Sequence, residues 1–98
     1  MTKEIVLSAL ESGKALELRY DGFNRLGEVH AVGLSKKEIP CMRVYQVSGG
    51  SVSGETQGWK LMLIDKSFSA HLTETPSEAP RPGYSKGDKG MTHIFGEI

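Results

Sequence analysis

The sequence predicts a small, mainly β domain with one short helix at its N-terminus. Short segments in which apolar and polar residues alternate recur between residues 15 and 72, and turn-forming residues separate them. Twelve glycines and four prolines in 98 residues are also typical of a loop-rich β architecture rather than a helical bundle. Five predicted strands within about 60 residues suggest a small barrel or sandwich.

The N-terminal segment is predicted to be an amphipathic helix from Thr2 to Ser12. Thr2 can cap its first turn, and Gly13 is a natural stop just beyond its last turn. A helix this short is marginal in water, so it must dock on the rest of the domain. Its apolar stripe is formed by i,i+4 pairs among Ile5, Val6, Ala9 and Leu10.

The middle of the chain carries the predicted strands. Asp21-Gly22 marks the first turn, and the loop that it opens is expected to close at Gly27. The serine- and glycine-rich segment 48–58 is interpreted as a flexible hairpin loop, because it lacks the Gly-Lys-Ser/Thr ending of a phosphate-binding P-loop. The expected strands are Ala15–Tyr20, Glu28–Leu34, Cys41–Val47, Trp59–Ile64 and Phe68–Leu72.

The C-terminal segment 73–98 is predicted to be an extended, Pro/Gly-rich tail that packs over the outside. Its last fifteen residues stay open between helix, strand and disorder, because an apolar set at helical spacing is interrupted by glycines. The domain organisation is therefore one unit, 1–98, with a helix in 1–13, a β unit in 15–72 and a tail in 73–98. The apolar set is Met91, Ile94, Phe95 and Ile98.

Composition limits the function classes. Twelve basic and twelve acidic residues give no net charge, so any attraction to nucleic acid must come from a local patch. The single cysteine, Cys41, excludes an internal disulfide framework and fits a reducing compartment. We find neither a membrane-length apolar run nor a signal-peptide pattern, so we expect a cytoplasmic protein without a membrane partner.

Catalytic and metal-binding patterns are weak. The candidate soft metal ligands do not lie at the two- to five-residue spacing of zinc sites, so neither a metal nor another cofactor is expected. A nucleophile with a partnered base is also not evident, so we expect a non-catalytic protein. The candidate ligands considered were His30, Cys41, His71 and His93.

A set of polar residues on or beside the predicted strands is the most informative feature. Arginine suits bidentate anion recognition, and aromatic rings such as Tyr20 and Trp59 can stack on a base. The alternative is that the polar side chains form a solvated face while the aromatic rings belong to the core. The candidate ligand-binding residues are Tyr20, Arg25, His30, Arg43, Gln46, Lys60 and Lys66.

Several segments together resemble the WYL domain family of bacterial and phage regulators. The stretch MRVYQVSGGSVSGETQGWKLMLIDKSF is similar to the family's third strand, Ser-Gly loop and fourth strand. LELRY, followed by Arg25 and Glu28-Val29-His30, resembles its tyrosine strand, arginine and Glu-Pro-His. RPGYSKGDKGM resembles the tail of some relatives. The resemblance implies a five-stranded Sm/SH3-like barrel.

The chain also departs from that family. Cys41-Met42-Arg43 stands where the Trp-Tyr-Leu tripeptide would be, and Val29 replaces a proline. Lys60 and Lys66 stand where arginines are common, which keeps the charge but loses the planar fork. Only a short helix precedes the predicted barrel, so sequence-specific DNA recognition by a helix-turn-helix is not expected from this chain.

The resemblance implies a regulatory domain that senses a ligand. We expect it to bind single-stranded nucleic acid or a nucleotide through the seven candidate residues and to modulate a transcriptional or defence-related partner. The alternative is a protein-interaction module that docks on another protein or forms a homo-oligomer through strand edges. A cryptic enzyme would need titratable groups that converge in a pocket.

Overall fold

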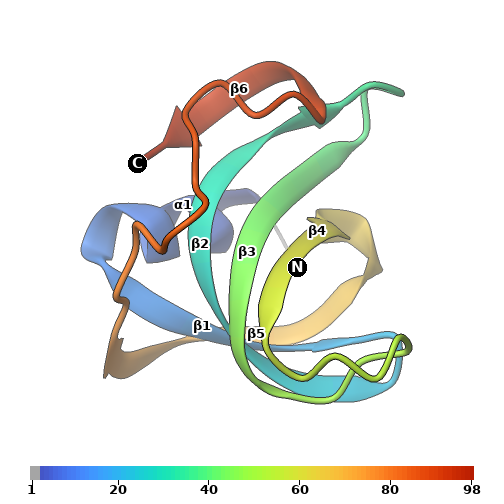
Figure 1. Ribbon diagram of the computed structural model, residues 1–98, viewed down its shortest axis with the longest axis vertical. Coiled ribbons are helices and arrows are strands. Elements are labelled where there is room, and N and C mark those ends of the chain that lie inside the picture. The colour runs from blue at the N-terminus through green and yellow to red at the C-terminus, as the bar shows by residue number, and fades with distance from the viewer. Residues whose placement is uncertain (1–2) are drawn as a thin grey trace.

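The computed structural model describes residues 3–98, which form one helix and six strands (Figure 1). A one-turn 3₁₀ helix, η1, joins the fourth strand directly to the fifth. The mainly β fold with an N-terminal helix is as the sequence predicts. The elements are α1 (Lys3–Ser12), β1 (Lys14–Tyr20), β2 (Phe23–Ser35), β3 (Pro40–Gly49), β4 (Gly58–Leu63), η1 (Ile64–Lys66), β5 (Ser67–Pro76) and β6 (Met91–Glu97).

The strands form one antiparallel sheet in the order β4-β3-β2-β1-β5. β2 is long enough to have two neighbours on one edge. β1 pairs with its first half and β6 pairs with its second half, at Ala31–Ser35. The sheet is strongly curved, and α1 lies behind it in Figure 1. Among residues 3–98 no pairing joins β4 to β5, so the sheet is open.

The main core lies between α1 and the concave face of the sheet. Val6 and Ala9 of α1 are buried there, so the helix docks through the stripe that the i,i+4 pattern predicts. Alternate residues of the central strands complete this core, because successive side chains of a strand point to opposite faces. The buried sheet residues are Leu16, Leu18, Val29, Val32, Met42, Val44, Met62 and Ile64.

The first hairpin is tighter than predicted. The loop expected to run to Gly27 is wrong, because Tyr20 and Phe23 are already paired across a two-residue turn. Asp21 and Gly22 both have positive φ, 50° and 80°, which is the conformation that an Asp-Gly hairpin turn requires. Gly27 instead lies within β2 beside a register shift, where a Cβ would collide with Val44. β2 therefore begins five residues earlier than the alternation suggests.

The C-terminal tail contains a sixth strand, so the prediction of five strands was one short. The helical spacing of the last apolar residues does not produce a helix, because residues 91–97 pair with β2 instead. Gly33 of β2 permits this pairing, since a Cβ there would collide with the His93 carbonyl group. β5 also continues to Pro76, four residues beyond its predicted end. Thr2, the predicted helix cap, lies outside the described residues.

Between β5 and β6, residues 77–90 cross the outer, convex face of the sheet; we call this segment the strap. Ser77 N–H donates to the Gly13 carbonyl at 2.8 Å and ties the start of the strap to the end of α1. Of the predicted tail, 73–98, residues 77–90 cross the outer face as the strap, whereas 73–76 belong to β5 and 91–97 form β6. None of the described helices is long and apolar enough to cross a membrane.

Candidate anion-binding site

The structure separates the seven predicted ligand-binding residues into three groups. The first lies where the β1–β2 turn meets the β3–β4 loop, at the lower right of Figure 1. His30 and Arg43 lie on the convex face under the strap. Lys66 is exposed on η1 and belongs to neither pocket described below. The first group consists of Tyr20, Arg25, Gln46 and Lys60.

Arg25 is a buried cation that has no anionic partner among residues 3–98. Its side chain is on β2 and the residue is only 4% exposed. Nη1 donates to Gln46 Oε1 at 3.2 Å and Nη2 donates to the Tyr20 carbonyl at 3.1 Å. Nε is buried without a hydrogen-bond partner among the described residues. The rings of Tyr20 and Phe23 lie 5.3 and 5.8 Å from the guanidinium carbon, so aromatic faces partly replace water.

Gln46 connects Arg25 to the β3–β4 loop. Its side chain is fully buried, and its Nε2 donates to the Gly50 and Thr56 carbonyls, both at 3.1 Å. Its Oε1 accepts the hydrogen bond from Arg25. Gln46 thus holds both ends of the loop against the buried guanidinium. This contact gives the loop, which the sequence suggested was a flexible hairpin, a defined place beside Arg25.

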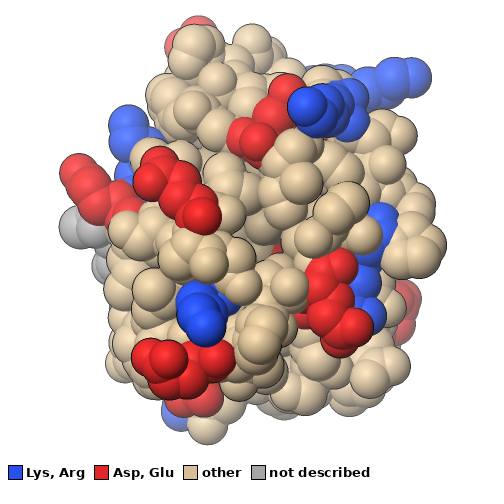
Figure 2. All heavy atoms as spheres, turned by 90° about the vertical axis from the view of Figure 1, so that its left-hand side faces the viewer, with Lys and Arg blue, Asp and Glu red and all other residues tan. Residues whose placement is uncertain are grey.

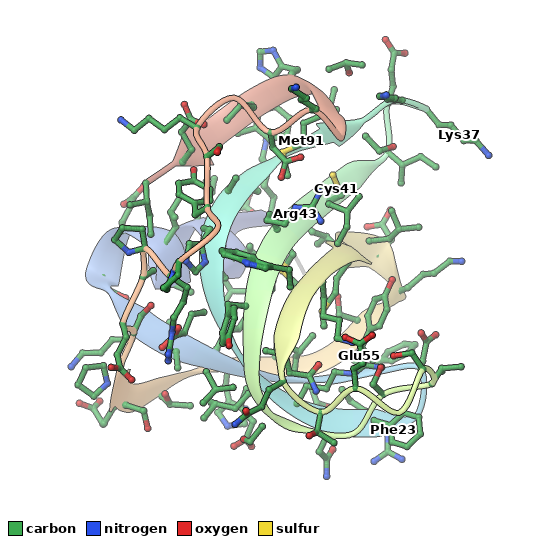
Figure 3. All side chains as sticks on the ribbon, in the orientation of Figure 1. Phe23, Lys37, Cys41, Arg43, Glu55 and Met91 are labelled. Carbon is green, nitrogen blue, oxygen red and sulfur yellow. The ribbon has the colours of Figure 1, made fainter. Side chains whose placement is uncertain are left out.

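Two glycines allow the loop to approach β2 so closely. Gly49 has a φ of +112°, and a Cβ there would collide with the Asn24 carbonyl and lie 2.7 Å from the Arg25 Cα. At Gly50 a Cβ would collide with the Phe23 ring. Phe23 and Glu55 mark this end of the sheet in Figure 3, and Lys37 lies at the opposite end. The adjacent glycines were a sequence signal for close backbone approach.

Lys60 and two loop serines form a triangle of polar groups. Lys60 Nζ donates to Ser51 Oγ at 3.2 Å and to Ser53 Oγ at 3.5 Å. The two hydroxyl oxygens lie 3.0 Å apart. Lys60 and Met62 are two residues apart on β4, so their side chains point to the same face of the sheet. Lys60 pairs with Val44 of β3, whose side chain is in the main core on that face. Within the described part of the chain, the hydrogen bonds of this ammonium group go to neutral hydroxyls.

A pocket of about 340 Å³ joins these groups; we call it the basic pocket. Among residues 3–98 no ion pair involves either of its cations. The exposed acidic residue Asp21 is also part of the lining. Ser51 and Ser53 were not among the predicted site residues, because the loop was interpreted as flexible. The polar lining consists of Tyr20, Asp21, Arg25, Ser51, Ser53 and Lys60.

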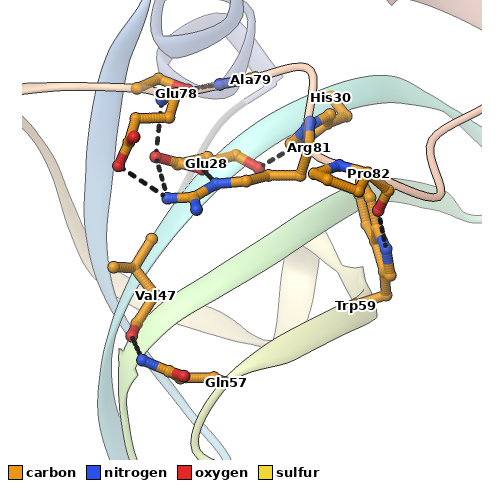
Figure 4. A network of polar contacts seen from close by, with 10 residues as sticks. Glu28, His30, Val47, Gln57, Trp59, Glu78, Ala79, Arg81 and Pro82 are labelled. Atoms are coloured by element: carbon orange, nitrogen blue, oxygen red, sulfur yellow. Dashed lines mark hydrogen bonds and ion pairs between the residues drawn. The ribbon is translucent and has the colours of Figure 1, made fainter.

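On the convex face, Glu28 holds the strap (Figure 4). The residue is 2% exposed, and Arg81 donates to it through Nε at 2.7 Å and Nη2 at 3.2 Å. Glu78 N–H donates to the same carboxylate at 2.7 Å. Burial acts to raise the pKa of the Glu28 carboxyl, but these hydrogen bonds outweigh it and the net pKa is lowered. Glu28 is therefore a structural anchor.

His30 is part of the same anchor. Its Nε2 accepts the Arg81 backbone N–H at 3.0 Å, so Nδ1 carries the proton and donates to the Glu28 carbonyl at 2.9 Å. Its ring lies between Trp59, at 4.6 Å, and Tyr84, at 5.1 Å. Burial lowers the pKa of His30, so the neutral ring is favoured. Both ring nitrogens are already occupied by contacts within the chain.

Arg43 is paired within the strap contact. Its Nε and Nη2 donate to the two carboxylate oxygens of Asp88 at 2.6 and 3.0 Å. This bidentate hydrogen bonding lowers the pKa of Asp88 and raises that of Arg43. Trp59, which was expected either in the core or in a stacking site, is half-buried and donates to the Pro82 carbonyl at 3.3 Å. Arg43 and Trp59 line a second pocket, of about 330 Å³, beneath the strap.

Charges on the side of the molecule shown in Figure 2 are of mixed sign. Lysine and arginine groups there lie among aspartate and glutamate groups, and they do not merge into a continuous basic surface. Within residues 3–98 no cluster of three or more His, Cys, Asp and Glu side chains is suited to a metal ion. The basic pocket lies at the lower right of Figure 1 and is not part of the view in Figure 2.

Comparisons with known proteins do not add to these contacts. No protein-family model, no curated protein and no solved structure matches this chain.

Proposed function

We propose that this chain is a non-catalytic regulatory domain that binds a phosphate-bearing ligand, single-stranded nucleic acid or a nucleotide, in the basic pocket. One observation carries the proposal. Arg25 is 4% exposed, lines the pocket and has no anionic partner among the described residues. Burying an unpaired cation costs several kcal/mol, and an anion bound beside it would offset that cost.

The other pocket groups fit the same ligand chemistry. Lys60 adds a second positive charge, and two hydroxyls beside it can donate hydrogen bonds to anionic oxygens. The Tyr20 hydroxyl is already used, since it accepts the Leu63 N–H at 3.0 Å. We therefore assign ligand contact to Arg25 and Lys60, and a positioning role to Tyr20 and Gln46.

We also propose that the fold is an incompletely closed Sm/SH3-like barrel of the WYL type. β4 and β5 are the two ends of the strand order, yet only the three residues of η1 connect them. A sheet whose end strands are linked so tightly must curl until they approach each other. The hydrogen bond from Leu63 N–H in β4 to the Tyr20 hydroxyl in β1 supports this curvature.

The resemblance and the contacts differ over two residues. His30 and Arg43 make their hydrogen bonds to the strap, on the face opposite the basic pocket. A ligand could reach Arg43 only in competition with Asp88. We therefore propose that in this chain these two residues hold the strap, and that Lys66 lies outside the ligand contact.

The test is binding of a single-stranded DNA ten nucleotides long, carrying a 5′-phosphate and a 3′-fluorophore, measured by anisotropy at 50 and 200 mM salt. We expect saturable binding at roughly micromolar protein that weakens with salt. Lys60→Gln should weaken it about tenfold, because it removes a charged donor. Lys37→Gln is the matched control, since Lys37 is exposed at the opposite end of the sheet (Figure 3).

No binding of this strand at about 100 μM protein would contradict nucleic acid as the ligand, since even non-specific nucleic-acid binding falls within that range. Equal losses in both lysine variants would contradict the assigned pocket. Light scattering on the same sample examines the alternative, a protein-interaction module. One feature favours that alternative: β5 is an edge strand on which Phe68 is 62% and Leu72 39% exposed. A stable dimer without ligand binding would support it.

A further inference from the structure

The basic pocket holds a small number of donors in one compact group. Lys60 Nζ, Ser51 Oγ and Ser53 Oγ lie 3.0 to 3.5 Å from one another. Such a triangle matches an anion that presents three oxygens from one centre. A phosphomonoester has three terminal oxygens and carries a charge of about −1.5 to −2 at pH 7. A phosphodiester of a nucleic-acid backbone presents two such oxygens and a single charge.

The positive charge of the pocket also matches one dianion better than a row of monoanions. Arg25 and Lys60 supply two positive charges to the lining, which also includes the exposed residue Asp21. Two of the other three arginines are already paired, Arg43 with Asp88 and Arg81 with Glu28, and Arg19 on β1 is not part of the pocket lining. A strand of nucleic acid needs a track of cations, one for each phosphate that it neutralises. The lining of the basic pocket contains no such track.

The mouth of the pocket offers an apolar surface beside the donors. Val52 stands between the two serines, lines the pocket and is 74% exposed. An exposed valine at the tip of a loop can contact the organic part of a ligand whose phosphate lies on the serines. A volume of about 340 Å³ is within the usual range for small-molecule pockets.

We infer that the basic pocket recognises a terminal phosphomonoester, namely a mononucleotide or the 5′-phosphorylated end of a strand, rather than internal phosphodiesters. This inference rests on the proposed function and narrows its ligand class. The three donors of the triangle contact the terminal oxygens, and the buried guanidinium of Arg25 stabilises the second negative charge. Val52 contacts the sugar or base.

The experiment compares ligands that differ in one phosphate. Three- and ten-nucleotide single strands of one sequence, each with a 5′-phosphate or a 5′-hydroxyl and each labelled at the 3′ end, are titrated with the intact chain. Thymidine monophosphate, thymidine and inorganic phosphate then compete for the site. We expect the 5′-phosphate to strengthen binding at least about tenfold, and the two phosphorylated lengths to bind alike.

Variants connect that preference to the triangle. Ser51→Ala with Ser53→Ala removes two exposed-loop hydroxyls and should reduce the advantage of the 5′-phosphate about tenfold. Asp21→Asn should strengthen binding of the phosphorylated ligands, because it removes a negative charge from a lining residue. Circular dichroism of each variant verifies that the sheet is retained.

The outcomes separate the inference from the proposed function. Competition by thymidine monophosphate but not by thymidine supports a nucleotide, whereas equal competition by inorganic phosphate would assign the site to the free anion and overturn the nucleotide. If 5′-hydroxyl strands bind as well as phosphorylated ones, and affinity rises with length, the inference is overturned while the proposed function stands. If none of the strands or nucleotides binds, both are overturned.

Discussion

At the scale of single residues, this chain uses its buried charges in two different ways. Glu28 is buried with its partner: it accepts two hydrogen bonds from Arg81 and one from the Glu78 N–H. Arg25 is buried with no anionic partner in the part of the chain that the structure describes. A buried charge that has an opposite charge beside it stabilises the structure only while both partners are present. A buried charge without such a partner destabilises the structure until a partner binds. The first arrangement is typical of an anchor and the second of a ligand site.

We predict that Glu28→Gln destabilises the protein by about 1.5–3 kcal/mol, because the hydrogen bonds from Arg81 lose their charged acceptor. Urea denaturation measures the loss. Trp59 is the only tryptophan, and it donates to a carbonyl of the strap, so its emission should shift to longer wavelength as the strap loosens. Glu17→Gln is the control; Glu17 pairs with His71, both are more than half exposed, and the expected change is below about 0.5 kcal/mol.

If the two glutamine variants lost the same stability, Glu28 would not be the anchor of the strap. An unchanged Trp59 emission in the Glu28 variant, despite a loss of stability, would place the damage elsewhere in the sheet.

At the scale of elements, the position of the β3–β4 loop decides whether the basic pocket exists. The loop supplies both serines, and the side chain of Gln46 holds its ends. The backbone at the start of this loop can lie close to β2 only because Gly49 and Gly50 lack side chains. The strap is the corresponding element on the convex face, where it is held by side chains of β2 and β3. One sheet thus carries a structural contact on one face and the candidate site at the end of the other.

We predict that Gly49→Ala disrupts this loop, because the new Cβ would collide with the Asn24 carbonyl at a positive φ. Gly54→Ala is the matched control: its φ is +85°, but no atom lies within 4 Å of a Cβ. The control should cost about 1 kcal/mol from the backbone conformation alone, and Gly49→Ala at least about twice that. Urea denaturation of the two variants measures the difference, and equal losses would show that the loop does not pack against β2.

At the scale of the whole molecule, stability should depend on pH through the contacts of the strap. The pKa of His30 is lowered from its ordinary value of 6.5 in the folded protein, mainly by burial. The unfolded chain therefore binds the additional proton as the pH falls below about 6.5, and the folded state loses stability there. The pKa values of Glu28 and Asp88 are also lowered, from 4.5 and 3.8, so their contribution is lost at still lower pH.

We predict a free energy of unfolding that is level from pH 8 to 7, declines below pH 6.5 and declines further below pH 4.5. Urea denaturation at each pH gives this profile. His30→Gln should remove the first decline, since glutamine does not titrate. His71→Gln should leave it in place, because His71 is 60% exposed. A first decline that persists in the His30 variant would assign it to another group.

Much of the fold follows from local pattern. The i,i+4 pairs of the first segment and the alternation in Leu16–Tyr20 and Cys41–Val47 reflect a buried face, and burial of one face imposes its period on the sequence. Asp21-Gly22 indicates a turn because few other residue pairs adopt two positive φ values. The pattern fails for the last seven strand residues, whose spacing is helical but whose neighbours in space, Ala31–Ser35, are about 60 residues away along the chain.

By itself the sequence determined that this is a small, mainly β protein with one docked helix, and it marked polar residues on the strands as candidates for ligand binding. The tertiary structure decided which of them work together. Arg25 and Arg43 are the same residue type on neighbouring strands. Among residues 3–98, Arg25 has no ion-pair partner at the end of the concave face, whereas Arg43 is bound by Asp88 on the convex face. Residue type sets what a side chain can bind, whereas its partner depends on contacts between residues far apart in the chain.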